Sequence, residues 1–181
     1  MKNERDAVRV LWLLAAAACS GPQSHDDALA TAEAFVDAFY AWDGDRLSRL
    51  LTPGVDADRV LYYQGWAEAA HYEVLERRPC EAGDAGEVVC AVTVTDDFGQ
   101  ALGYTATDTF TMTLGNGRVT AVTFAGDDPP VFEAVFEWLA ESRPEVFTGP
   151  CMDMFEGGRT PDDCARAVAR GARDYAAGAR R

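Results

Sequence analysis

The sequence lacks most of the groups that hydrolases and nucleotide-binding proteins use. Lys2 is its only lysine, so the chain after residue 18 has no amine for a Schiff base and none for a phosphate-binding loop. No serine stands in a Gly-x-Ser-x-Gly context. Basic residues are also scarce: 16 Lys and Arg face 30 Asp and Glu, for a net charge of −14. Such a surface repels phosphate, so we expect no nucleic-acid partner.

Histidine is nearly absent too, and the five cysteines do not have the spacing of zinc ligands. An odd number of cysteines in an exported chain needs an explanation. If Cys19 is set apart, four remain in two local pairs. Cys80 and Cys90 flank a polar turn, and Cys151 and Cys164 close a second loop. Two disulfides are favoured over a metal site, and we expect no metal and no cofactor.

The first eighteen residues are typical of an export signal. A weakly basic start is followed by an apolar run of about ten residues, which is too short to span a bilayer. Ala16-Ala17-Ala18-Cys19 resembles the lipobox of bacterial lipoproteins, in which the cysteine carries the lipid. Cleavage after Ala18 by an ordinary signal peptidase stays open as the alternative. We predict a signal peptide over 1–18 and a lipid-anchored linker over 19–26.

Helical periodicity follows the linker. Leu29, Val36 and Phe39 belong to an apolar stripe at three- and four-residue spacing, and Asp43 is a cap for a second, short helix. A third helix is predicted over 58–70. After the strands, Pro129-Pro130 opens another helix, with Phe132 and Phe136 on its inward face.

Between these helices the sequence predicts two joined β-hairpins over 80–126, after a first strand over 72–80. Threonines at 105, 107, 109, 111 and 113 alternate with a mostly apolar set that includes Asp108 and Phe110. A two-residue turn at Asn116-Gly117 would pair Phe110 with Thr123. A three-residue loop would pair Phe110 with Val122, and we favour it because it keeps Val122 and Phe124 on the apolar face and Val119 with the threonines.

At this point the order is three helices and then a meander of four strands, and the chain resembles the NTF2-like superfamily, which includes SnoaL-like and ketosteroid-isomerase-like proteins. The resemblance rests on residues 35–47 running into Leu50-Leu51 and covers about residues 27–142. It implies an α+β fold, a curved antiparallel sheet wrapped around the first helix to make a cone. It also implies an open end that is often a pocket for a small apolar molecule. Members include enzymes and domains that only bind, so the fold leaves function open.

The chain continues beyond the usual cone. Residues 143–181 are predicted to form a helical extension stapled by the second disulfide, with Cys164 and Val168 on one side of its last helix and Arg166 and Arg170 on the other. We expect this extension to cover the cone or its edge.

Two residues are candidates for catalysis, Asp108 and His71. Asp108 lies among apolar neighbours, where burial would raise the pKa of its carboxyl and suit it to proton transfer. A place at the rim, or an ion pair with an arginine, is the alternative. His71 would titrate near neutral pH, although a histidine at a helix–strand junction is more often a packing group. The candidate ligand-binding residues are Tyr40, Trp42, Tyr63, Trp66, Tyr104 and Phe110.

We therefore expect an exported domain at the cell envelope, held at the membrane only through a lipid on Cys19, that binds a small apolar molecule or an envelope protein. Secretion as a soluble protein, and a homodimer, stay open. The alternative function is an isomerase or dehydratase with Asp108 as general base. The two are separated by whether Asp108, His71 and a tyrosine face one cavity.

Overall fold

The structure is a computed structural model that describes residues 24–152, 154 and 161–179. The predicted signal peptide and Cys19 lie outside the described residues. In chain order the elements are α1 (His25–Tyr40), α2 (Gly44–Leu50), α3 (Asp58–Ala69), β1 (Glu73–Arg77), β2 (Glu81–Ala82), η1 (Asp84–Gly86), β3 (Glu87–Thr95), α4 (Asp97–Leu102), β4 (Ala106–Gly115), β5 (Arg118–Gly126), α5 (Pro130–Ser142), α6 (Glu145–Thr148) and α7 (Asp162–Ala179). No helix in this part of the chain has the length and apolar character that crossing a membrane requires.

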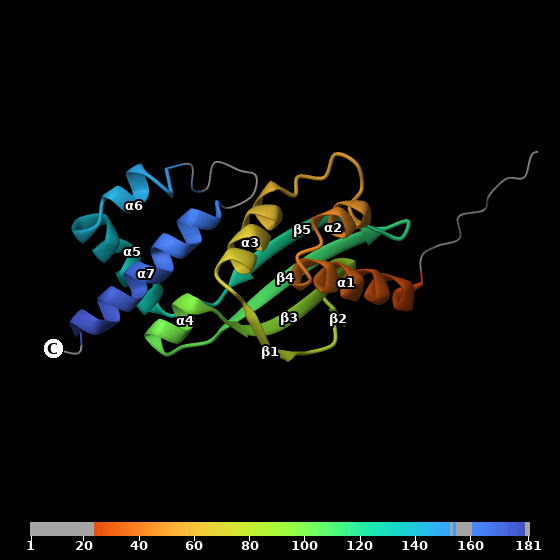
Figure 1. Cartoon of the computed structure of the whole chain (residues 1–181). Coiled ribbons are helices and arrows are strands. Elements are labelled where there is room, and N and C mark those ends of the chain that lie inside the picture. Colours follow the sequence, from red (N-terminus) through yellow and green to blue (C-terminus); the bar gives the residue numbers. More distant parts are fainter. Residues whose placement is uncertain (1–23, 153, 155–160, 180–181) are drawn as a thin grey trace, which may run out of the picture.

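The predicted α+β fold class is confirmed, with helices packed on an antiparallel sheet. The sheet is antiparallel with strand order β1-β3-β4-β5, and the short β2 also pairs with β3. Helices α1, α2 and α3 precede the sheet in the chain, and α1 packs against β3, β4 and β5. Figure 1 shows α5, α6 and α7 gathered at one end of the molecule, beside α4, with α1 and α2 toward the other end.

The helix boundaries follow local capping chemistry. The Ser24 hydroxyl accepts a hydrogen bond from the Asp27 amide at 3.1 Å, so α1 begins at His25, two residues ahead of the predicted domain start. Asp43 caps α2 as predicted, accepting from the Arg46 amide at 2.8 Å. The buried Gln64 of α3 donates to two carbonyl oxygens at the end of α1, which fixes α3 against that end.

The hairpin of β4 and β5 corrects the predicted register. Asn116 and Gly117 both have positive φ and form a two-residue turn, so the expected three-residue loop is wrong. Phe110 pairs with Phe124, rather than with Val122 or Thr123, because a β-bulge follows the Leu114–Val119 pair.

The bulge also explains which side chains face inward. Before it, Val119 is fully buried, although the sequence pattern placed it with the outward threonines. After it, Phe124 is buried, as predicted. Strict alternation cannot bury both residues, and the extra residue at the bulge removes that conflict.

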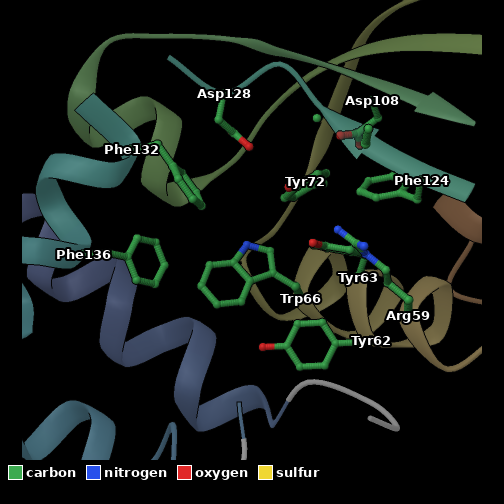
Figure 2. Close-up of a pocket in the computed structure, with 12 residues that line it drawn as sticks. Arg59, Tyr62, Tyr63, Trp66, Tyr72, Asp108, Phe124, Asp128, Phe132 and Phe136 are labelled. Atoms are coloured by element: carbon green, nitrogen blue, oxygen red, sulfur yellow. The ribbon is translucent and has the colours of Figure 1, made fainter. Parts of the chain in front are cut away.

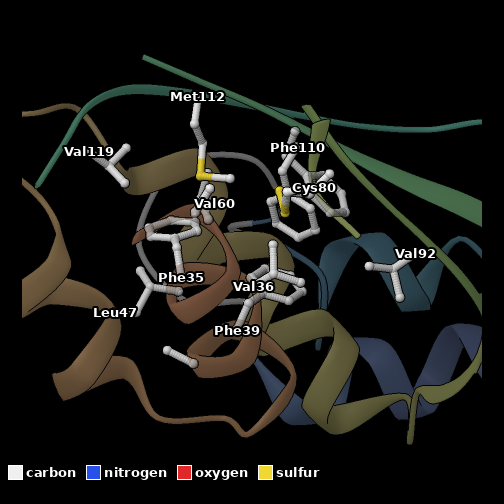
Figure 3. Close-up of a cluster of buried hydrophobic side chains, with 14 of the residues drawn as sticks. Phe35, Val36, Phe39, Leu47, Val60, Cys80, Val92, Phe110, Met112 and Val119 are labelled. Atoms are coloured by element: carbon white, nitrogen blue, oxygen red, sulfur yellow. A yellow bond between two sulfur atoms is a disulfide. The ribbon is translucent and has the colours of Figure 1, made fainter. Parts of the chain in front are cut away.

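Two hydrophobic clusters make up the interior. The first, which we call the cone cluster, lies between α1 and the inner face of the sheet. Phe35, Val36 and Phe39 of α1 point toward Phe110 and Met112 of β4, and all five side chains are fully buried (Figure 3). Phe39 and Phe110 meet edge to face with ring centroids 5.0 Å apart. This contact ties the first helix to the sheet.

The second cluster, which we call the helical cluster, joins α3 and α4 to the C-terminal helices. Leu139 of α5 and Val168 and Ala172 of α7 are fully buried within it. Gly171 lets α7 approach α5 closely, since a β-carbon added there would lie 2.4 Å from a methyl group of Leu139. The extension therefore packs beside α3 and α4 and continues the core.

Each cluster contains one of the predicted disulfides, and both pairings are confirmed. Cys80 is bonded to Cys90 in the cone cluster, and Cys151 to Cys164 in the helical cluster. Disulfides are typical of proteins that fold outside the reducing cytosol.

Candidate functional site

A pocket of about 240 Å³ lies where the two clusters meet, between α3, the end of β5 and α5 (Figure 2). Its lining comes from α3, from strands β4 and β5, from α5 and from the segments that join these elements. The lining residues are Arg59, Tyr62, Tyr63, Trp66, Tyr72, Asp108, Phe124, Ala125, Gly126, Asp128, Phe132 and Phe136.

Aromatic rings form most of the pocket wall. Tyr63 and Phe124 lie with ring centroids 4.6 Å apart on the cone side. On the other side Phe132 and Phe136, one helical turn apart on α5, have centroids 4.9 Å apart, and Trp66 lies 6.5 Å from Phe136. Such rings offer apolar contact and π faces to a ligand.

Asp108 is a buried carboxylate on this wall, with only 3% of its surface exposed. The Tyr40 hydroxyl donates a hydrogen bond to its Oδ2 at 2.6 Å. Among the described residues, none donates a hydrogen bond to Oδ1. Burial raises the pKa of Asp108 from 3.8 to about 7, the Tyr40 hydrogen bond opposes this, and the charges of Asp128, Asp96 and Asp127 add to it. The carboxyl is thus poised to gain or lose a proton near neutral pH.

Further carboxylates surround Asp108. Asp96 is buried and caps α4 by accepting from the Gly99 amide at 2.6 Å; burial raises its pKa to about 6. Asp128 lies exposed at the rim, and partial desolvation and the neighbouring Asp127 raise its pKa. The pocket region therefore has a negative potential wherever these groups are ionised.

The same surroundings change the pKa values of three tyrosines. Burial, and then nearby aspartates, raise the pKa values of Tyr40, Tyr72 and Tyr104 far above that of free tyrosine. Their hydroxyls consequently stay protonated and can act only as neutral hydrogen-bonding groups.

Arg59 is the cation of the pocket lining. Its guanidinium carbon lies 5.7 Å from the centroid of the Tyr63 ring, a cation–π contact, and the side chain is exposed. No carboxylate of the described residues makes a salt bridge with it. Arg59 is therefore a positive charge at the pocket that no described carboxylate pairs with.

The predicted site residues separate into groups. Asp108, Tyr63 and Trp66 line the pocket, and Tyr40 is one hydrogen bond behind it. Phe110 is fully buried in the cone cluster beneath the wall.

The remaining candidates lie elsewhere. Tyr104 contacts Asp128 at 3.5 Å from outside the lining, and Trp42 borders a different surface hollow beside α2. His71 is on the surface, with 71% of its side chain exposed and its Nδ1 3.1 Å from Asp97. The structure thus brings Asp108 and tyrosines together but leaves His71 apart from them.

Sequence reasoning missed Arg59, Tyr72 and Asp128, and it assigned Phe132 and Phe136 to an inward helix face without placing them at a site. Their spacing of four residues carries that inward signal. What no local pattern carries is that these two side chains share a pocket with α3 and with the end of β5. Among the described residues no group of histidine, cysteine and carboxylate side chains could hold a metal ion.

Comparison with known proteins identifies similar folds only. No family model matches the sequence, and no curated protein matches it. Among solved structures, a protein from Kribbella flavida is 19% identical over 66% of this chain and 98% of its own, with a TM-score of 0.43. A candidate polyketide cyclase from Silicibacter is 17% identical over 63% and 94%, with a TM-score of 0.40.

AclR, a candidate hydroxylase from Streptomyces galilaeus, is 18% identical over 67% of this chain and 97% of its own, with a TM-score of 0.41. Likenesses at this level transfer neither an activity nor a binding residue to this chain.

Proposed function

We propose that this protein is an exported, lipid-anchored domain that binds a small molecule in the pocket beside Asp108. The observation that carries the proposal is a pocket of about 240 Å³ lined mainly by aromatic rings with one buried carboxylate. Small-molecule sites have this composition, an apolar wall with a few polar groups that fix orientation. The two disulfides support export.

Binding can be tested with prodan, a neutral dye whose emission shifts in an apolar pocket. We expect saturable one-to-one binding that Phe132→Ala weakens, because Phe132 lines the pocket. Phe147→Ala is the matched control, since Phe147 is equally half-buried beside the helical cluster but does not line the pocket. Equal loss in both variants, or no saturable binding, would refute the proposal. Mass spectrometry of small molecules that co-purify with the mature protein would then identify the natural ligand.

Anchoring has its own test. Cys19→Ala should move the protein from the membrane fraction to the soluble fraction, because the cysteine is the proposed attachment point for the lipid. A variant that stays membrane-bound would contradict the lipoprotein interpretation while leaving the pocket proposal intact.

A second candidate function is an isomerase or dehydratase with Asp108 as general base. It is favoured by one observation, a buried carboxyl with a pKa of about 7 in the lining of an aromatic pocket. In that case Asp108→Asn should abolish turnover and leave affinity for a neutral substrate nearly unchanged, since an amide cannot take up the proton.

A further inference from the structure

The geometry points to an organic cation, an ammonium or amidinium group on an apolar body, as the ligand of this pocket. This inference rests on the proposed function and adds the chemical class of the ligand. It follows from two carboxylates, from the aromatic rings of the lining and from the position of Arg59 over one of those rings.

Two carboxylates converge on one open space in the lining. A β-carbon added at Gly126 would lie 3.6 Å from Asp108 Oδ1 and 3.1 Å from Asp128 Oδ2. Glycine at this position leaves that space empty. Both oxygens therefore face the same side of the pocket, where a positive group would meet them together.

The rest of the wall suits the same ligand. Trp66, Tyr63 and Phe124 present π faces and edges beside the carboxylates (Figure 2). Rings of this kind attract alkylammonium groups, which bind poorly to water-filled sites of hydroxyls and amides. An aromatic wall without carboxylates would accept neutral molecules equally well, so the combination is what selects a cation.

Arg59 already makes a cation–π contact with one ring of this wall. Its guanidinium lies over Tyr63 with no salt-bridge partner among the described residues. Because Arg59 is exposed at α3 while Asp108 is 3% exposed, a ligand cation would take the inner position and Arg59 would compete with it. An anionic ligand would instead pair with Arg59 and be repelled by Asp108, which gives the two classes opposite responses to loss of Arg59.

The affinity for a cation should depend on pH. Asp108 is faced by Tyr40 from α1, Tyr72 after α3, Asp96 after β3, Asp127 and Asp128 after β5, and Arg59 from α3. The tyrosines stay neutral, so the charge that faces the ligand changes through the carboxyl of Asp108. With a pKa of about 7, Asp108 must lose its proton to face the cation as a full charge, and affinity should rise from pH 5.5 to pH 8.

The experiment compares three probes of one size as displacers of prodan: phenyltrimethylammonium, its neutral isostere tert-butylbenzene, and benzenesulfonate. None of them titrates between pH 5 and 8. We expect the cation to displace prodan at a concentration about tenfold lower than the neutral probe, and the anion to be weakest. If prodan binds but the neutral or anionic probe displaces it as well as the cation does, the inference fails and the proposed function stands. If prodan does not bind, the proposed function itself fails.

Two variants sharpen the result. Arg59→Gln should strengthen binding of phenyltrimethylammonium severalfold, because a competing like charge is removed. Arg49→Gln, which changes the net charge equally on exposed α2, should leave it unchanged. Asp108→Asn should weaken the cation about tenfold and flatten its pH dependence, with Asp45→Asn as the surface control. Weaker cation binding in Arg59→Gln would overturn the inference.

Discussion

The cone cluster and the helical cluster are built differently, and the pocket exists because of that difference. In the cone cluster, large side chains from α1 and β4 interlock, and Phe35, Phe39 and Phe110 are fully buried. In the helical cluster the deeply buried residues are mostly small, such as Ala165 and Ala172, so helices approach by their backbones. Phe98 is buried among them, but other rings of this cluster, Phe132 and Phe136, are only partly buried.

These partly buried rings form one side of the pocket. Phe132 and Phe136 are only partly buried by the helical cluster, and they face Phe124, which belongs to the cone cluster. Neither cluster alone would enclose the site. A side chain fully inside one cluster should therefore control stability, and a side chain between the two should control binding.

The largest effect is expected from Phe39→Ala. Loss of a fully buried ring that contacts Phe110, Phe124 and Tyr40 should lower the free energy of unfolding by about 3–5 kcal/mol. Phe132→Ala, the same substitution between the clusters, should cost less than half of that and weaken prodan binding more. Chemical denaturation and dye titration of both variants measure this contrast. Equal losses of stability would mean that a side chain between the clusters matters as much for folding as one buried inside the cone cluster, which would contradict this contrast.

Asp108→Asn tests the charged group at the boundary of the clusters. A pKa raised from 3.8 to about 7 means that the folded state binds the proton more tightly, so this group's contribution to stability is fully present below pH 3.8 and is lost as pH rises through 7. The difference is on the order of 4 kcal/mol. Asn stays neutral, so the variant should be more stable than the wild type at pH 8 and lose this advantage toward pH 5.

Thermal unfolding at several pH values measures that difference directly. A large loss of stability at every pH would indicate instead that the carboxylate is a required structural partner. No arginine of the described residues pairs with Asp108, and its hydrogen-bond partner is Tyr40, which an amide oxygen can also serve.

Much of the fold could be predicted because its signals are local. Asp43 as a cap, the alternation of β4 and the cysteine spacings each depend on a few neighbouring residues. Helix α4 was missed because six residues are too few for helical periodicity, although Asp96 as cap and Gly103 in the left-handed conformation mark its two ends.

The register and the site could be predicted only in part. Asp108 was found because one carboxylate interrupts an apolar strand face. The bulge after Val119 has no clear sequence signal, so the pairing was wrong although Phe124 was assigned to the correct face. Arg59, Asp128 and Phe132 come from three elements that meet only through tertiary packing, which local patterns do not record.

Gly171→Ala tests the close packing of helices in the helical cluster. The added β-carbon would lie 2.4 Å from Leu139 Cδ2, so the buried Leu139 side chain must shift or α5 and α7 must move apart, and we expect a loss of about 1–3 kcal/mol. Gly178→Ala on the same helix is the matched control, because a β-carbon there meets nothing within 4 Å. The control should be neutral or slightly stabilising through helix propensity. If both variants behave alike in thermal unfolding, close backbone packing is not what holds the helical cluster together.

Tyr40→Phe should have the smallest effect and the most specific one. It removes the hydroxyl that donates to Asp108 Oδ2 at 2.6 Å and leaves the ring in place against Phe39 and Phe110. We expect a loss of about 1–2 kcal/mol at pH 8, where the carboxylate is ionised and loses its donor, and a smaller loss at pH 5, where it is protonated.

The pKa of Asp108, measured by NMR, should rise above that of the wild type in Tyr40→Phe, since the hydrogen bond opposes the effect of burial. A double-mutant cycle with Asp108→Asn separates this coupling from packing losses, because an amide gains little from the hydroxyl compared with a carboxylate. A loss that is the same at both pH values, and unchanged when residue 108 is Asn, would place the effect of Tyr40 in the packing of the cone cluster. A loss confined to the ionised state would show instead that the hydrogen bond from Tyr40, at the end of α1, helps to set the charge of Asp108. A residue packed in the cone cluster would then control the chemistry of the pocket.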